Sequence, residues 1–128
     1  MTAPAPTIRD YAISAQSTDV FGRVLVSARD HRFLVDGPVQ NGCPGEEVTP
    51  PELFLSSVAA CGVELVQVIA KETGKAVGKV NLAVRATVDR GNQKRAGVTV
   101  FNTVRMDFAI GGTDGATAAE LVEAFKRR

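Results

Sequence analysis

A run of almost entirely apolar and small residues, from Leu53 to Ala70, constrains the fold of this chain more than any other feature. The residues before it are those of a helix start: Thr49 can cap, Pro50 suits the first helical position, and Glu52 can close a capping box. A glycine after Thr73 is a natural left-handed stop. The sequence therefore predicts a helix from Pro50 to about Thr73.

A helix that is apolar on nearly all sides needs cover on nearly all sides. Its longest nearly uncharged apolar stretch, Leu53–Val63, is far shorter than the roughly 20 residues that cross a bilayer. A chain of 128 residues suits one domain, and its one sheet cannot cover the whole helix. The sequence therefore predicts a single domain over residues 1–128, a partner subunit over the other helix face, and no membrane contact.

Segments that suit β-strands lie on both sides of the predicted helix, and a short amphipathic helix follows them. The first strands are rich in Val, Ile, Ser and Thr, and the later ones alternate apolar and polar residues. Strands and helices in this segregated order predict an α+β fold. The predicted elements are strands within residues 11–28, at 32–35, 80–88 and 98–110, and a helix at 117–128.

Two segments are predicted to lack regular structure. Residues 1–6 contain two prolines and are expected to form a loose arm. Residues 37–50 contain three glycines and three prolines, and they join the first strands to the long helix. Loops of this length in compact domains are often functional, so this loop is a candidate part of a site.

Charge and cysteine content exclude several classes of protein. A net charge of +1 offers no electrostatic footprint for nucleic acid or for an anionic membrane. The first residues carry no basic patch before an apolar run, so no secretory signal is expected and the predicted location is the cytoplasm. With one histidine in the chain, a zinc site of His31, Cys43 and Cys61 would be short of ligands. No metal or organic cofactor is expected.

Cys61, on the predicted helix, is the most informative candidate for chemistry, and two interpretations of it stay open. A cysteine inside a buried helix is most often a small core residue. A reactive thiolate needs a nearby cation and access from the surface. Glu64 shares a helix face with Cys61 and would disfavour a thiolate by charge repulsion. A reactive Cys61 therefore requires an arginine from elsewhere, and the candidates are Arg23, Arg29 and Arg32.

Glu52 and Cys43 are two further residues that could act together with the Cys61 thiol. Glu52 precedes Cys61 by nine residues, which places it on the opposite side of a regular helix and roughly 13 Å away along the axis. Helix capping is therefore the simpler role for Glu52. Cys43 lies in the predicted loop, from which it could form a reversible disulfide with the helix thiol.

The run from Thr49 to Cys61, TPPELFLSSVAAC, resembles the signature of the OsmC/Ohr family, the osmotically inducible protein C and organic hydroperoxide resistance proteins. Members carry a similar helix, with Pro-x-Glu-Leu at its start and Ala-Ala-Cys further on, after a loop rich in glycine and proline. The resemblance covers nearly the whole chain, and the helix motif is its specific part. It implies an α+β fold in which long central helices lie in the middle of an intertwined homodimer.

The resemblance also implies a chemistry. In catalytic members a peroxidatic cysteine on this helix attacks an organic hydroperoxide, and the sulfenic acid that forms condenses with a second cysteine. An arginine from the N-terminal strands and a glutamate before the helix activate the thiolate. By this resemblance the three residues are Cys61, Arg23 and Glu52, while the glutamate of the best-studied members falls where Pro51 stands here.

The second cysteine of the family follows the last helix, where this chain ends at Arg128. The expectation is therefore a shortened chain, or a reaction completed by Cys43 or by an external thiol reductant. The predicted function is thiol-dependent reduction of organic hydroperoxides in oxidative stress defence, without a cofactor. Two alternatives stay open: a non-catalytic OsmC-like dimer that binds an apolar small molecule, and a hotdog-type thioesterase in which Glu64 faces the acyl group.

Overall fold

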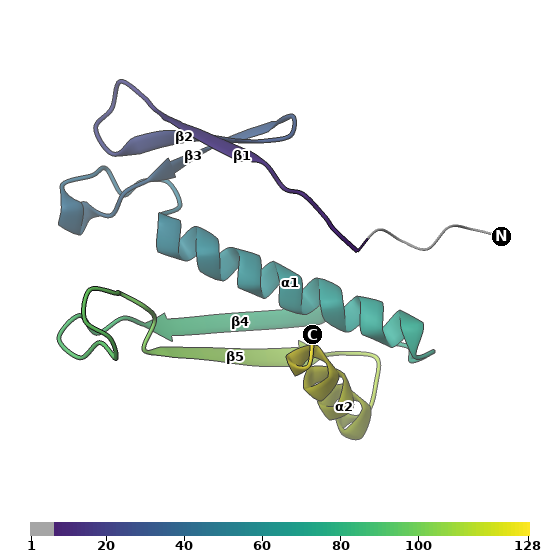
Figure 1. The fold of residues 1–128 in the computed structure, drawn as a ribbon. Helices are drawn as coiled ribbons and strands as arrows, with labels where there is room; N and C mark the ends of the chain where they lie inside the picture. The colour runs from purple at the N-terminus through teal and green to yellow at the C-terminus, as the bar shows by residue number, and fades with distance from the viewer. Residues whose placement is uncertain (1–6) are drawn as a thin grey trace. The chain divides into compact units, whose positions relative to one another are not determined.

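A computed structural model describes residues 7–128, so the arm predicted at residues 1–6 lies outside the described residues. The chain divides into two compact units, Met1–Leu53 and Phe54–Arg128. The strands are consecutive in sequence within each sheet and are separated from the long helices, which confirms the predicted α+β class (Figure 1). The elements are β1 Ile13–Ser17, β2 Arg23–Ala28, β3 His31–Asp36, the short 3₁₀ helix η1 Val39–Asn41, α1 Pro50–Glu72, β4 Val80–Thr87, β5 Thr103–Ile110 and α2 Gly115–Lys126.

The first unit contains an antiparallel sheet in the order β1-β2-β3. A two-residue loop joins β2 to β3, and its first residue, Arg29, has a positive φ of 54°, as tight hairpin loops require. The hairpin register places Arg23 directly opposite Asp36. The strand-rich region predicted at residues 11–28 is divided into β1 and β2 because a turn at residues 18–22 separates them.

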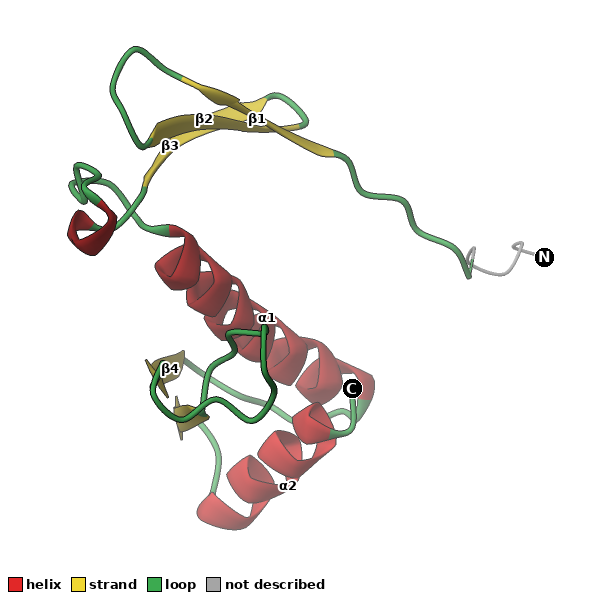
Figure 2. Cartoon of the chain, turned by 60° about the vertical axis from the view of Figure 1, so that its left-hand side comes forward, coloured by secondary structure: helices red, strands yellow, loops and turns green. Residues whose placement is uncertain are grey.

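In the second unit, α1 lies across one face of the antiparallel hairpin formed by β4 and β5 (Figure 2). Gly62 is buried on the side of α1 that meets this hairpin. A Cβ atom at Gly62 would come within 2.5 Å of the Leu82 side chain and 3.4 Å of Met106 and Phe108. The absence of a side chain at this position therefore permits the close approach of helix and sheet.

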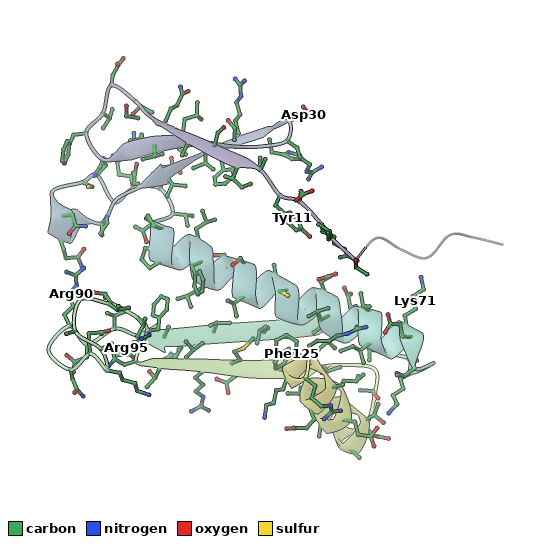
Figure 3. All side chains as sticks on the ribbon, viewed as in Figure 1. Tyr11, Asp30, Lys71, Arg90, Arg95 and Phe125 are labelled. Carbon is green, nitrogen blue, oxygen red and sulfur yellow. The ribbon has the colours of Figure 1, made fainter. Side chains whose placement is uncertain are left out.

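A small apolar core joins α2 to α1. Phe125 of α2, labelled in Figure 3, packs edge-on against Phe108 of β5, and the two ring centroids are 5.5 Å apart. Leu121 is the buried residue of α2, with 2% of its surface exposed. The packing of α2 therefore depends on a few apolar contacts. The buried members of this core are Val66, Ile69, Ala70 and Leu121.

The long apolar helix forms nearly as predicted, and its last residue lies one position before the expected end. The carboxylate of Glu52 accepts hydrogen bonds from the backbone N–H of Thr49 at 3.0 Å and from its hydroxyl at 2.7 Å, as a capping pair does. Four of the 23 helix residues are buried within the chain. The predicted burial on nearly all sides is therefore not reached by one copy of the described chain.

The same helix is long and apolar enough to cross a membrane by length and composition alone, with a mean hydropathy of 1.9 over its most apolar window. The helix continues past Glu64, the charged residue that ends the stretch Leu53–Val63. Core helices of soluble proteins meet the same criterion, so this finding is weak evidence for a membrane span. The predicted absence of membrane contact stays a prediction.

The strand predicted at residues 98–110 begins later, at Thr103. Asn102 accounts for the difference, because its side chain builds the preceding loop. Its carbonyl oxygen accepts a hydrogen bond from the backbone N–H of Asp89 at 2.7 Å, and its amide donates to the carbonyl of Asn92 at 2.7 Å. Side-chain bonds of this kind satisfy backbone groups that a longer strand pairing would use.

The last helix begins at Gly115, two residues earlier than predicted. Asp114 caps it, since its carboxylate accepts a hydrogen bond from the backbone N–H of Thr117 at 2.7 Å. This hydrogen bond is the largest of the effects that lower the pKa of Asp114. The carboxylate therefore stays ionised at the positive end of the helix dipole, where a negative charge is favourable.

Candidate functional site

The predicted site residues are distributed over both units. Arg23 and Glu52 belong to the first unit, and Cys61 belongs to the second. Arg23 lies at the start of β2, Glu52 in the first turn of α1 and Cys61 further along the same helix. The grouping of the three residues around one thiolate stays a prediction.

Cys61 is a free thiol on an exposed part of α1. The next residue, Gly62, faces the β4–β5 hairpin, whereas Cys61 is not a member of the buried core of the second unit. Within one copy of the chain, the thiol therefore has the surface access that a nucleophilic thiolate needs. One copy of the chain therefore does not bury Cys61 in its own core, and the choice between the two interpretations of this residue stays a prediction.

Arg23 forms a two-point ion pair with Asp36 across the β2–β3 hairpin. The guanidinium Nε donates to Oδ1 of Asp36 at 2.7 Å, and Nη2 donates to Oδ2 at 2.9 Å. The Asp36 side chain is completely buried, while 22% of the Arg23 side chain is exposed. Two parallel hydrogen bonds of this kind fix the plane and direction of the guanidinium as well as its distance.

Asp36 also binds the loop that leads to α1. The backbone N–H groups of Glu46 and Glu47 donate to Oδ2 of Asp36 at 3.0 and 2.9 Å. A second carboxylate, that of the exposed Glu46 side chain, accepts a hydrogen bond from Nη2 of Arg23 at 3.2 Å. Asp36 therefore links β2, β3 and the loop through one buried carboxylate.

These contacts shift the proton affinities of the groups involved. Hydrogen bonding to the Arg23 guanidinium, helped by the two backbone N–H groups, holds the pKa of Asp36 well below its usual range against the opposing effect of burial. The hydrogen bonds to Asp36 in turn raise the pKa of Arg23. The hydrogen bonds from Thr49 lower the pKa of Glu52. Arg23, Asp36 and Glu52 are therefore all charged at neutral pH.

Asp36 is absent from the residues that the sequence predicts for the site. The signal that could have found it is the symmetry of a hairpin. A two-residue turn at Arg29 and Asp30 pairs residue 28 with 31, and continuing that register pairs Arg23 with Asp36. Opposite charges at directly opposed strand positions favour an ion pair.

Among the three candidate arginines, Arg23 is the one that the described residues hold in an ion pair. Arg29 and Arg32 are exposed, at the hairpin loop and on β3, and neither forms an ion pair within residues 7–128. A guanidinium held in one orientation by an ion pair is better prepared to serve a reaction than one without such a contact. This difference favours Arg23 among the candidates.

Cys43 is a free, half-buried thiol in the loop of the first unit. Its side chain packs over two glycines, Gly22 and Gly37, and a Cβ atom on either one would overlap the sulfur. The space for Cys43 therefore exists because two neighbouring residues have no side chain. A role of Cys43 in completing the reaction stays a prediction.

Within the part of the chain that the structure describes, no group of three or more histidine, cysteine, aspartate or glutamate side chains is placed to hold a metal ion. His31 is exposed at the start of β3. In the first unit the carboxylates of Asp36 and Glu46 instead bind the Arg23 guanidinium, and this arrangement orients the arginine side chain.

Comparison with known proteins identifies relatives of this chain. The sequence model of the OsmC-like protein family matches residues 43–128. Among curated protein sequences, none matches at a significant level. An OsmC-like protein from Mycoplasma pneumoniae has a similar structure, with 16% sequence identity and a TM-score of 0.78, and the match covers 94% of this chain and 82% of that one.

Two further solved structures are similar. An organic hydroperoxide resistance protein OsmC from Legionella pneumophila is 17% identical, with a TM-score of 0.75 and coverage of 95% of this chain and 85% of that one. An organic hydroperoxide resistance protein from Elizabethkingia anophelis, with thiocyanate bound, is 17% identical, with a TM-score of 0.74 and coverage of 96% and 85%. At these identities the likeness establishes the fold.

Proposed function

Because this chain belongs to the OsmC-like protein family, we propose that it reduces organic hydroperoxides through the thiol of Cys61, in defence against oxidative stress. Structures with the same fold include organic hydroperoxide resistance proteins, which supports a role in oxidative stress. The observation that carries the proposal is a free, exposed thiol on the apolar helix that bears the family motif.

The proposed reaction uses the Cys61 thiolate as a nucleophile. Its sulfur attacks the terminal oxygen of the hydroperoxide, the O–O bond breaks, and the alkoxide leaves as an alcohol after it takes up a proton. Two electrons pass from sulfur to the peroxide, and Cys61 becomes a sulfenic acid. An external thiol then condenses with the sulfenic acid and releases water, and a second external thiol reduces the mixed disulfide.

In this proposal Arg23 is the cation that stabilises the Cys61 thiolate. A guanidinium stays charged at every relevant pH, and an adjacent positive charge lowers the pKa of a thiol. Glu52 contributes at the start of the helix, where its hydrogen bonds with Thr49 fix the first turn of the element that carries Cys61. The site would use no metal or organic cofactor.

The proposed reaction predicts a specific chemical change. A variant with Cys43→Ser carries a single thiol, so treatment of the reduced protein with one equivalent of cumene hydroperoxide should remove that thiol and form a sulfenic acid at Cys61. Dimedone traps this species, and mass spectrometry of the digested protein locates it. In the parent protein, loss of both thiols and a Cys43–Cys61 disulfide would show that Cys43 replaces the external thiol.

Retention of the free thiol at Cys61 after exposure to the peroxide would reject the proposed function. In that case, saturable binding of an apolar dye would favour the non-catalytic alternative. Hydrolysis of acyl-CoA without peroxide consumption would favour the thioesterase.

We also propose that the active form is a homodimer. Apolar side chains lie exposed in both units, with Phe54 of α1 58% exposed and Ile13 of β1 64% exposed. Exposed apolar surface is unfavourable in water, and large continuous patches of it mark association sites. Sedimentation equilibrium should therefore give twice the 13.5-kDa chain mass. A single-chain mass at micromolar concentration would contradict this proposal.

A further inference from the structure

We infer that Asp36 is a positioning residue for Arg23: its buried carboxylate holds one edge of the guanidinium, so that the remaining nitrogen, Nη1, can serve the reacting sulfur or the peroxide. This inference rests on the proposed function, in which Arg23 stabilises the Cys61 thiolate. It adds a residue outside the helix motif, and that residue would act without touching the substrate.

The hydrogen bonds of the guanidinium support this assignment of one edge to Asp36 and of Nη1 to the reaction. An arginine side chain has five N–H donors, one on Nε and two on each terminal nitrogen. Asp36 accepts from Nε and Nη2, and Glu46 accepts from Nη2 as well. The donors of one edge are therefore occupied, while Nη1 makes no hydrogen bond to any described residue. Both N–H groups of Nη1 remain for an anion.

Asp36 is itself held in place, which a positioning residue requires. Its side chain is fully buried and accepts from the backbone N–H groups of Glu46 and Glu47. Its own backbone N–H donates to the carbonyl of Val48 at 3.1 Å. Hydrogen bonds that do not involve Arg23 therefore help to hold this carboxylate in place. The Glu46 side chain is 76% exposed, and among the described residues its carboxylate accepts a hydrogen bond only from Arg23.

The energetics of burial also favour a positioning role. Burying a carboxylate in an ion pair carries a desolvation cost, and such a pair adds little net stability compared with apolar residues of the same volume. We therefore infer that Asp36 serves mainly to fix the orientation of the Arg23 side chain, which is long and has many rotamers. An oriented guanidinium loses less conformational freedom when it meets an anion.

The experiment measures the reactivity of Cys61 directly, without relying on turnover. The rate of alkylation by iodoacetamide is recorded against pH in a Cys43→Ser background, where one thiol remains. The background protein is compared with Arg23→Ala, Asp36→Asn, the double variant and a control variant, Asp30→Asn. Asparagine keeps an oxygen that can accept from the Glu46 and Glu47 backbone but loses the charge. Denaturant unfolding of each protein shows that it is folded under the assay conditions.

We expect the two single substitutions to slow alkylation in the same direction and their effects to be non-additive. Arg23→Ala should slow alkylation at pH 7 about tenfold and move the midpoint of the pH profile upward, because the thiolate loses its cation. Asp36→Asn should slow it about fivefold in the same direction. The double variant should match Arg23→Ala alone, since Asp36 acts through Arg23. Asp30→Asn, at the exposed hairpin loop (Figure 3), is the matched control and should change nothing.

Two results would overturn the inference while the proposed function stands: an unchanged profile in Asp36→Asn when Arg23→Ala shifts it, or an equal effect of Asp36→Asn with and without Arg23. An unchanged profile in Arg23→Ala would instead remove Arg23 from the proposed function. If Asp36→Asn does not fold, Asp36→Glu takes its place, because it keeps the charge and displaces the carboxylate by one methylene. A profile of Asp36→Glu identical to that of the background protein would then overturn the inference.

Discussion

Replacement of Cys61 by serine is expected to lower kcat/KM for cumene hydroperoxide by at least about 1,000-fold. A serine hydroxyl fills nearly the same volume, but it stays protonated at neutral pH and is a far weaker nucleophile than a thiolate. The change therefore removes the reacting atom and leaves the exposed helix surface almost as it was. Peroxide consumption with excess dithiothreitol, measured by a ferrous iron and dye assay, gives the rate.

A matched variant makes this result specific to the sulfur. Ala60→Ser introduces the same hydroxyl one residue earlier, on an exposed position of α1, and should retain the parent rate. Equal circular dichroism spectra of the two variants would show that the helix is intact in both. Residual activity above one tenth of the parent in Cys61→Ser would mean that another group reduces the peroxide, and the proposed function would fail.

Replacement of Leu121 by alanine is expected to lower the free energy of unfolding by about 3 kcal/mol. Leu121 is 2% exposed and contributes the buried side chain of α2 to the core that includes Val66 and Ile69 of α1. Removing three carbon atoms there loses apolar burial and leaves a cavity that a small core closes only in part. Urea unfolding at fixed protein concentration measures the effect, because association would otherwise shift the apparent stability.

Leu121→Met is the control for the loss of volume. A methionine of similar size can refill the same space, so its cost should stay below about 1.5 kcal/mol. A change below about 1 kcal/mol in Leu121→Ala would contradict the assignment of this core. It would mean that α2 contributes little to the stability of the second unit.

The long helix could be predicted closely from the sequence because its signals are local. The capping residues Thr49 and Glu52, the proline at position 50 and the glycine after Thr73 each act within one helical turn. The start of β5 could not be predicted in this way. The valines at positions 98 and 100 match a strand pattern, but Asn102 bonds to residues ten and thirteen positions earlier and builds a loop there. Bonds over that distance leave no periodic trace in the sequence.

Some residues of the candidate site could be identified from the sequence and one could not, and the difference has a physical reason. Cys61 and Arg23 carry reactive or charged groups that stand out by residue type. Asp36 does not stand out, because an aspartate before glycine and proline is typical of a turn. Its burial and its four hydrogen bonds become visible only when β2 and β3 are paired and the following loop folds back.

The register of the β2–β3 hairpin has a consequence for sequence variation in this protein. Arg23 and Asp36 meet because the loop between their strands is two residues long. One inserted or deleted residue there would offset the strands by one position, and side chains at adjacent positions of a strand point to opposite faces. Exposed loop tips normally tolerate such length changes. This one would have to keep its length wherever the guanidinium is needed, although no atom of the loop takes part in the chemistry.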